Sequence, residues 1–272
     1  MMTIHRLSKA TAALVVAGLM VRATPVMAQG PFVTVDYMKV APGQDDAYLQ
    51  LEQKTWKPVH EARVKAGNAL GWYLYRVESP SGTSADHNYV TVAVYKSFEA
   101  LENPYPNELI SKIVPAQSVP EFMKKTLAAR ELVRSETWEG FGSMPEVPLD
   151  KPAPFLMVEY MKVPSGGFAA YDEVEKLWKK IHEVRIKEGT LANWGVYARV
   201  FPGGSDYPYN FATASGYSHF KDLNGLDFPS LVQKAALGMS VNEIGDKTAK
   251  ARDLVRSELW VLVDYVQAPP QK

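Results

Sequence analysis

Residues 56–67 read WKPVHEARVKAG, and residues 178–189 read WKKIHEVRIKEG. The two segments lie 122 residues apart, and we expect that shift to hold without a gap to the ends of both copies. It pairs Trp72 with Trp194, and it pairs LVRSETW at 132–138 with LVRSELW at 254–260. The sequence therefore predicts a tandem duplication of one domain.

Each copy shows the same order of predicted elements. In the first copy, alternating patterns predict strands at 32–40, 70–77, 88–95 and 132–141, and helical periodicity predicts helices at 45–66 and 118–130. The order β-α-β-β-α-β is the signature of a ferredoxin-like domain. Helices cover one face of such a sheet, and the other face here carries Trp, Tyr and Phe, which makes it too apolar to face water. We therefore expect an α+β protein whose two tandem ferredoxin-like domains pack sheet to sheet as an intramolecular α/β barrel.

The ends of the chain differ in character from these copies. A basic start, an apolar run at 10–21 and VMA at 26–28 are typical of a signal peptide over residues 1–28. An apolar run of this length is too short to span a bilayer, so we expect cleavage and export to the periplasm or the medium. The predicted domains are repeat 1 at 29–141, a Pro-rich linker at 142–154, repeat 2 at 155–264 and a disordered tail at 265–272.

The charge and the cysteine content of the sequence argue against several kinds of partner and site. The full chain has 30 basic and 30 acidic side chains, and the predicted signal contains three of the basic ones and no acidic one. Because the mature chain then has a slight negative charge and no basic stripe, neither nucleic acid nor a membrane surface is an expected partner after cleavage. The absence of cysteine excludes disulfides, thiol nucleophiles and thiolate metal sites.

The repeated helix carries the first set of candidate binding residues. A helical wheel places His60 and Arg63 on the flank of the apolar stripe beside Trp56, and His182 and Arg185 repeat this arrangement. In a functional interpretation they lie at the rim of a cavity, where the His shuttles protons or ligates haem and the Arg pairs with an anion. In a structural interpretation the Trp packs on the sheet while His and Arg bind carbonyl groups near the helix C-terminus.

The fourth strand of each copy carries the second set. Alternation places one arginine, one glutamate and one tryptophan on a single face of each strand. The residues are Arg134, Glu136 and Trp138 in the first copy and Arg256, Glu258 and Trp260 in the second. We expect this face to line the inter-sheet cavity, where a buried Arg–Glu pair must be matched or bind a polar group. The alternative is a salt-bridged pair at a wet strand end.

The third strand of the second copy has smaller side chains than that of the first, and the sequence lacks several known site motifs. Val90, Val92 and Val94 become Ala212, Ala214 and Gly216, which predicts more free volume in the second copy. No pair of histidines has metal-ligand spacing, so we expect no metal site. No Gly-x-Ser-x-Gly elbow, phosphate loop or dinucleotide fingerprint is present, and the sequence therefore identifies no catalytic residue.

The motif Tyr-x-Lys-Val-x-Pro-Gly at 37–43, within the β-α-β-β-α-β half, resembles the dimeric α/β-barrel superfamily. That group includes antibiotic-biosynthesis monooxygenases, NIPSNAP-like and EthD-like proteins, and the two-lobed chlorite-dismutase and dye-peroxidase relatives. The resemblance implies a monooxygenase-like or haem-dependent enzyme. Because no acid/base pair or ligand set stands out, we favour the other hypothesis, an exported protein that binds a small, partly aromatic ligand in the inter-sheet cavity. The chain lacks the Gly-x-x-Asp-Gly motif of the haem peroxidase branch. The cofactor, the ligand and a homo-oligomeric state therefore stay open.

Overall fold

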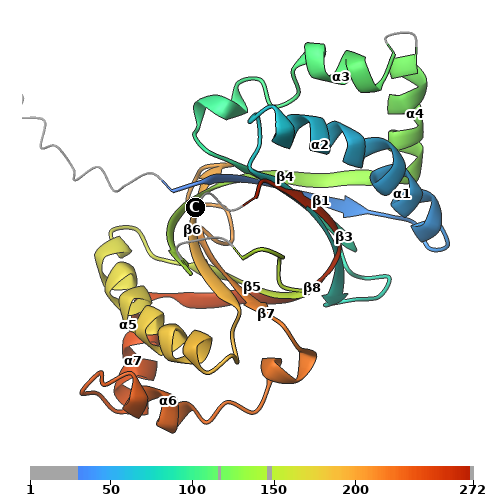
Figure 1. Ribbon diagram of the computed structural model, residues 1–272. Helices are drawn as coiled ribbons and strands as arrows, with labels where there is room; N and C mark the ends of the chain where they lie inside the picture. Colours follow the sequence, from blue (N-terminus) through green and yellow to red (C-terminus); the bar gives the residue numbers. More distant parts are fainter. Residues whose placement is uncertain (1–29, 116–117, 146–148, 270–272) are drawn as a thin grey trace, which may run out of the picture.

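The computed structural model describes residues 30–115, 118–145 and 149–269. Their eight strands form one closed antiparallel barrel in the order β1-β3-β2-β8-β5-β7-β6-β4, with β4 beside β1 again. Helices lie only outside this barrel, those of the two halves on opposite sides (Figure 1). The fold is thus α+β with a closed barrel, as the sequence predicts. The predicted signal peptide and part of the linker and tail lie outside the described residues.

The elements follow the predicted order in both halves. The strands are β1 Phe32–Lys39, β2 Gly71–Ser79, β3 Tyr89–Tyr95, β4 Glu131–Met144, β5 Phe155–Lys162, β6 Asn193–Phe201, β7 Phe211–Tyr217 and β8 Asp253–Gln267. The α-helices are α1 Asp45–Leu51, α2 Lys57–Lys65, α3 Asn107–Ile113, α4 Val119–Ala129, α5 Phe168–Lys187, α6 Phe228–Lys234 and α7 Val241–Ala251.

The fourth strand of each half is longer than predicted and joins the two halves. The first part of β4 pairs with β1, and its second part, from Thr137 to Met144, pairs with β6 of the other half. β8 likewise pairs first with β5 and then, from Leu259 to Gln267, with β2. Because these crossing pairs extend the strands, β4 enters the predicted linker and β8 enters the predicted tail. The barrel is therefore closed by backbone hydrogen bonds as well as by packing.

The prediction of an ungapped shift of 122 is wrong for the start of each copy. Val40 and Val163 make the same hydrogen bond to an asparagine side chain, and so do Trp56 and Trp178 to a threonine hydroxyl. The valines are 123 residues apart and the tryptophans 122, so the first copy holds one extra residue between them. It lies in a π-helical turn, η1 (Glu52–Trp56), whereas α5 is α-helical throughout. A π turn accommodates one inserted residue while the helix on either side keeps its contacts.

One predicted helix cap forms and the other does not. Ser240 and Glu243 make the reciprocal hydrogen bonds of a capping box at the start of α7. The equivalent Ser118 makes no side-chain cap bond, because its backbone is in the helical region and its N–H bonds to the carbonyl of Pro115. An N-cap residue needs an extended backbone, which this turn prevents.

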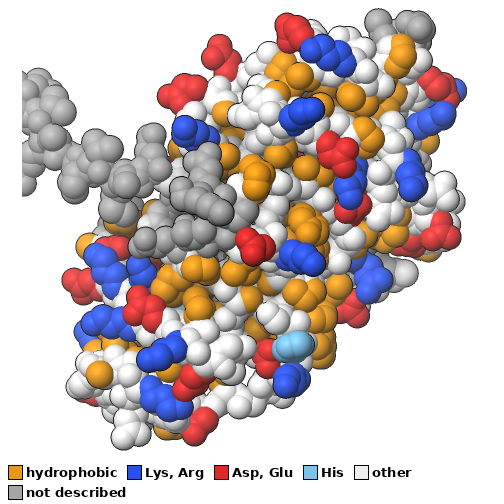
Figure 2. All heavy atoms as spheres, in the orientation of Figure 1, with side chains coloured by type: hydrophobic (Ala, Val, Ile, Leu, Met, Phe, Trp, Pro, Cys, Tyr) orange, Lys and Arg blue, Asp and Glu red, His pale blue; other side chains and the backbone are white. Residues whose placement is uncertain are grey.

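Strand alternation separates two apolar regions. Val33, Val35 and Tyr37 of β1 face the barrel interior, while Met38 faces the helices with Tyr48. Outside, basic and acidic side chains are interspersed on the face shown in Figure 2, so that face has no patch of one sign. Among the described residues, no helix is long and apolar enough to cross a membrane.

Candidate ligand site in the barrel interior

The barrel contains a partly open cavity of about 380 Å³ between its two halves. The side chains around it are mainly aromatic and aliphatic, and none of the described lining residues is charged. Both halves contribute rings to its wall, among them Tyr37, Tyr75, Trp138, Tyr160, Tyr197 and Trp260. A partly open, mostly apolar space of this size is typical of a site for a small molecule.

The extra volume predicted at Gly216 is not empty. A side chain at Gly216 would meet the Oδ1 atom of Asn193 at 2.0 Å and the Cβ atom of Ala153 at 2.9 Å. Asn193 stands opposite Gly216 in the register of β6 and β7 and fills the space. Ala212 and Ala214 do border the cavity, as the sequence suggested, but so do Val92 and Val94. The cavity therefore lies between the halves and does not belong to the second one alone.

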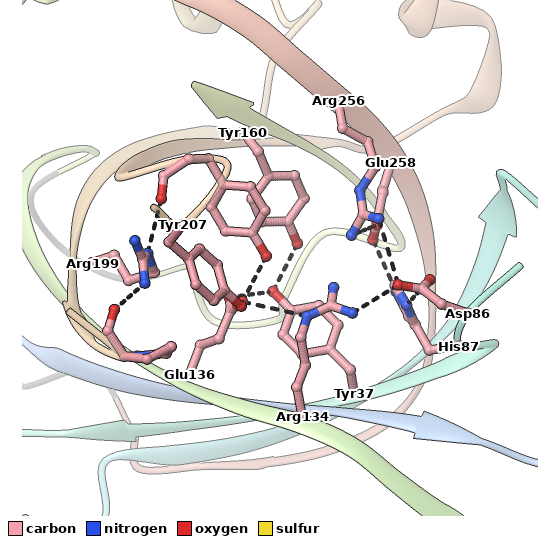
Figure 3. Close-up of polar contacts among 12 residues, drawn as sticks. Tyr37, Asp86, His87, Arg134, Glu136, Tyr160, Arg199, Tyr207, Arg256 and Glu258 are labelled. Carbon is pink, nitrogen blue, oxygen red and sulfur yellow. Dashed lines mark hydrogen bonds and ion pairs between the residues drawn. The ribbon is translucent and has the colours of Figure 1, made fainter. Parts of the chain in front are cut away.

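Two tyrosines meet across the barrel at the inner end of this cavity. The hydroxyl groups of Tyr37 on β1 and Tyr160 on β5 lie 2.9 Å apart (Figure 3). Both rings are almost completely buried, and both line the cavity. Burial raises the pKa of both hydroxyl groups well above the ordinary value, so each keeps its proton at neutral pH. They form a polar floor under a mainly apolar wall, which also contains Ser143, Asn193 and Thr213.

Glu136 lies behind this floor and is 1 % exposed. Its Oε2 atom accepts a hydrogen bond of 3.0 Å from Tyr37, and its Oε1 atom accepts bonds of 2.6 Å from Tyr207 and from Tyr209. The Nε atom of Arg134 lies 3.3 Å from Oε1. This carboxylate is therefore surrounded by donors from both halves of the barrel, which compensates its burial.

Glu258, the equivalent residue of the second half, is equally buried but has different partners. Its Oε2 atom accepts a bond of 2.7 Å from the indole of Trp260 and lies 3.2 Å from Nε2 of His87, while Arg256 reaches Oε1 at 2.6 Å. Burial alone would raise the pKa of Glu258. The hydrogen bond and charge of His87, with the charge of Arg256, lower it below the ordinary value instead.

An exposed carboxylate closes this end of the barrel. Asp86 contacts Nδ1 of His87 at 2.6 Å and Nη1 of Arg134 at 2.9 Å, and Arg256 approaches it at 3.7 Å. Burial would raise the pKa of Asp86, but these positive neighbours lower it below the ordinary value. The charged groups thus form one network between the tyrosine floor and the solvent (Figure 3).

The structure brings together the residues predicted on the fourth strands. Trp138 and Trp260 border the cavity, Glu136 and Glu258 are buried behind its floor, and Arg134 and Arg256 stand at the outer side of that floor. This face points into the barrel, but of the six predicted residues only Trp138 and Trp260 border the cavity. The alternative of pairs in water at a strand end is wrong for both glutamates. Whether these residues bind a ligand remains a prediction.

The residues predicted on the repeated helix do not border the cavity. His60 stacks on Trp72 with ring centroids 4.5 Å apart, and Arg63 donates to the carbonyl of Pro104 and to the hydroxyl of Tyr95. His182 and Arg185 lie similarly between α5 and the outer face of the sheet, where His182 packs on Trp194. Both His–Arg pairs are buried, whereas residues at the rim of a cavity would be partly exposed to solvent. These contacts are structural, but they differ from the predicted ones: His60 and His182 pack on the sheet tryptophans, Trp56 packs on α4, and, among the described contacts, only Arg63 binds a carbonyl group.

Sequence reasoning missed the tyrosines that hold Glu136. Tyr207 and Tyr209 lie in the turn before β7, where no periodicity indicates which way a side chain points. Tyr37 begins the motif at 37–43, but the sequence did not indicate that its hydroxyl would bond to Glu136. One sequence feature could have pointed to Tyr209. At the shift of 122 it aligns with His87, and both residues precede the third strand of their half.

The cavity as lined here lacks the usual partners of a haem. Haem iron needs an axial His, Cys, Met or Tyr, and the described lining contains no histidine or cysteine and no arginine or lysine that would pair with propionates, although Met144, Tyr73, Tyr75 and Tyr197 border it. Its tyrosines Tyr37 and Tyr160 are bonded to one another, and both ring nitrogens of His87 contact carboxylates. The described residues also contain no group of three or more side chains that would hold a metal ion.

Comparisons with known proteins identify the fold. No family model matches the chain, and no curated protein matches its sequence. Among solved structures it is similar to a "putative monooxygenase" of Lactobacillus acidophilus (8 % identity, 89 % of this chain and 98 % of that one, TM-score 0.55). It is also similar to a "putative monooxygenase" of Fusobacterium nucleatum (10 %, 90 % and 98 %, 0.55). A point mutant of chlorite dismutase from Candidatus Nitrospira defluvii matches with 10 % identity over 87 % of this chain and 92 % of that one, at a TM-score of 0.50.

Proposed function

We propose that this chain, which has the fold of the dimeric α/β-barrel superfamily, binds a small, uncharged and largely aromatic ligand inside its barrel. The observation that carries the proposal is the cavity of about 380 Å³, which has aromatic walls and no charged side chain among its described lining residues. Burying a charge there would be costly, whereas a flat apolar molecule would replace water with ring contacts. An apolar cavity of about 150 Å³ already binds benzene in another protein, so a two-ring molecule is a suitable probe.

Naphthalene binding tests this proposal. Trp138 and Trp260 line the cavity, so we expect naphthalene to alter tryptophan fluorescence in a saturable way. Ala214→Phe would fill the cavity, and we expect it to weaken binding at least tenfold. Ala170→Phe, at an exposed position of α5, is the matched control and should bind as the parent does. The absence of saturable binding to the folded parent protein would refute the proposal.

An oxygenase-type enzyme is the second candidate function. It is supported by the likeness to the two solved structures named as monooxygenases and by the buried tyrosine–glutamate network beside the cavity. Dioxygen uptake with a bound phenol, measured with an oxygen electrode, tests it. The haem-dependent form of this candidate predicts a Soret band in protein purified from its source. The lining residues lead us to expect none.

We also propose that residues 1–28 are removed on export, so that the mature chain begins at Gln29. The support is the basic, apolar and small-residue pattern of the N-terminus. Intact-mass measurement on protein from the native source, with separate analysis of periplasm, medium and cytoplasm, tests this. A chain that retains residues 1–28 in its final compartment would contradict the proposal.

The two halves are best interpreted as tandem ferredoxin-like domains at about 29–141 and 155–264. The support is the strand order in the barrel, in which β4-β1-β3-β2 and β8-β5-β7-β6 follow the same pattern. Equivalent hydrogen bonds, such as those from Trp56 and Trp178, add to it. In this proposal the segment between β4 and β5 serves as the linker.

A further inference from the structure

A groove of about 640 Å³ lies on the outer face of the sheet in the first half, between strands β1 and β4 and the segment 98–105. Val35 and Tyr37 point into the barrel, so the alternate residues of β1, Thr34 and Asp36, point outward into this groove. The groove is therefore separate from the barrel cavity. Its described lining contains three hydroxyl side chains, three carboxylates and four aromatic rings, but no lysine or arginine.

The internal duplication shows that this lining is not required by the fold. Three register neighbours on β1, β4 and β6 contribute to the lining: Thr34, Thr137 and Phe201. The same three places of the second half, on β5, β8 and β2, hold different residues: Met157, Leu259 and Ser79. Two long apolar side chains thus stand in the second half where the first half has two short hydroxyl side chains. The first half gains space at these places and has an aromatic ring beside it.

Two of the rings that line the groove are exposed side by side. Phe98 is 43 % exposed and Phe201 is 55 % exposed, and their ring centroids lie 6.2 Å apart. Neighbouring exposed apolar side chains of this size often mark a binding surface. The face of an aromatic ring carries negative electrostatic potential, which attracts a cation. The ring of Tyr105 already has such a partner, because the guanidinium of Arg63 lies 4.0 Å from its centroid.

Asp36 places a carboxylate in the groove next to its register partner Ser135, which also lines it. Burial raises the pKa of Asp36 above the ordinary value, although a hydrogen bond from Ser135 and the charges of Arg130 and Arg63 act in the opposite direction. The nearby positive charges therefore do not fully compensate the burial of this carboxylate. A further positive charge in the groove would stabilise its ionised form.

Two exposed carboxylates, those of Glu99 and Glu102, add negative charge to the same lining. At the shift of 122 the second half has Lys221 and Asn224 at their places, so the negative charge is also particular to the first half. An anion in the groove would be repelled by three carboxylates, whereas a cation would be attracted.

We propose that this groove is a second binding site, which takes a small organic cation with an apolar body, such as a protonated primary amine. The ammonium group lies beside Asp36, where the hydroxyl oxygens of Thr34 and Ser135 can accept further N–H bonds. The apolar body packs on the rings of Phe98 and Phe201. The site does not depend on a ligand in the barrel cavity.

Three matched probes test the proposal: benzylammonium, benzyl alcohol and benzoate. They share a phenyl ring and differ in having a positive, a neutral and a negative polar group. A cation–π contact and an ion pair at a partly exposed site together predict that benzylammonium binds the folded parent protein at least about fivefold more tightly than benzyl alcohol. Benzoate should bind more weakly than benzyl alcohol. Calorimetry measures the affinities, and that of benzylammonium should fall between about 20 mM and about 500 mM NaCl.

Variants that use the residues of the second half locate the site. Thr34→Met/Thr137→Leu fills the groove with side chains that the fold already accommodates at the equivalent places, and should weaken benzylammonium binding at least tenfold. Phe201→Ser, at an exposed position, should weaken it at least threefold. Ala214→Phe, which fills the barrel cavity, should leave it unchanged. A thermal melt of each variant establishes that it is folded.

The contribution of the carboxylate is tested separately. Asp36→Asn should reduce the preference for benzylammonium over benzyl alcohol to less than about twofold. Glu173→Gln is the matched control, because it removes the same charge from an exposed position of α5 in the other half, and should keep the preference. If Asp36→Asn does not fold, the Phe201→Ser and double-variant results decide.

The outcomes are distinct from those for the barrel cavity. The proposal is overturned if benzyl alcohol or benzoate binds the parent protein as tightly as benzylammonium, or if Thr34→Met/Thr137→Leu keeps the parent affinity. Loss of benzylammonium binding in Ala214→Phe would also overturn it, because the cation would then lie in the barrel. Naphthalene binding should be the same in Thr34→Met/Thr137→Leu as in the parent, so each site can fail without the other.

Discussion

His87 and Tyr209 occupy equivalent places in the two halves, 122 residues apart, and each reaches the buried glutamate of the opposite half. Each ring also packs on the central tyrosine of its own half. The His87 ring lies 4.9 Å from that of Tyr37, and the Tyr209 ring lies 4.7 Å from that of Tyr160. The first half thus has an imidazole at this place, and the second half has a phenol hydroxyl.

This equivalence predicts the effect of exchanging the side chain. His87→Tyr should preserve a donor for Glu258 and cost less than about 1 kcal/mol. His87→Leu should cost about 1–3 kcal/mol more, because it removes a hydrogen-bond partner from a buried carboxylate. Urea unfolding of the two variants measures the difference. Equal stability of His87→Tyr and His87→Leu would show that the contact with Glu258 contributes nothing.

Trp56 is predicted to hold α2 against α4. Its indole donates a bond of 3.2 Å to the hydroxyl of Thr126 and packs on Phe122 with ring centroids 4.6 Å apart. Because the side chain is only partly buried, Trp56→Ala should cost about 3 kcal/mol, at the lower end of the range for such changes. Leu127→Ala, on α4 but 70 % exposed, is the control and should change stability by less than about 0.5 kcal/mol.

The extra residue in η1 predicts unequal tolerance to deletion. Removing the exposed Lys54 should convert the π turn into α-helix and leave stability within about 1 kcal/mol, because α5 is already built that way. Removing the exposed Lys176 from α5 should rotate the preceding turns by about 100° and take Tyr171 and Glu175 out of the core. We expect that deletion to cost more than 3 kcal/mol. Circular dichroism melts compare the two, and equal losses would contradict the insertion.

Much of the fold and the direction of the fourth strands could be predicted from the sequence. The duplication and the alternation in LVRSE placed Arg134 and Glu136 toward the interior, because a strand with a two-residue period has only two faces. The helix boundaries followed from stop signals such as Gly67, which has a positive φ of 77°.

The remaining features depend on contacts between the halves. β4 continues through Gly140 and Gly142, which weaken a strand pattern, because β6 of the other half supplies its hydrogen bonds. The tyrosines around Glu136 come from a turn whose side-chain directions follow no period. The inserted helix residue was hidden because a π turn keeps both flanking faces in register. Each of these features is tertiary, and local patterns do not encode it.

Histidines and glutamates buried between the helices and the sheet are expected to change the stability of the protein with pH in opposite directions. Burial, aided by Arg185, lowers the pKa of His182 to about 3, and burial with the charge of Arg63 lowers that of His60 well below the ordinary value. The unfolded chain therefore takes up these protons below about pH 6.5 while the folded chain does not. The histidines thus make the protein less stable as pH falls from 6.5 toward 3.

Two buried glutamates change the stability with pH in the opposite direction. Burial raises the pKa of Glu52 and of Glu175 to about 7. The folded chain keeps these protons up to about pH 7, whereas the unfolded chain releases them above about pH 4.5. Their contribution to stability is therefore present below pH 4.5 and lost as pH rises through 7. Between pH 4.5 and 6.5 the histidines and the glutamates oppose one another.

Replacing the histidines should separate these contributions. In the double variant His60→Phe/His182→Phe, we expect the free energy of unfolding to rise by about 4 kcal/mol between pH 7 and pH 5, about 2 kcal/mol from each of the two glutamates, because the opposing histidine contribution is removed. The parent protein should show a smaller rise or a fall over the same interval. Urea unfolding at pH 5, 6 and 7 measures both slopes, and the comparison of slopes is insensitive to any uniform loss of stability in the variant. Adding Glu52→Gln to the double variant should reduce its rise, since one of the two raised carboxyls is then gone. Identical slopes in the parent and the double variant would mean that His60 and His182 titrate normally, and the burial argument for both would be wrong.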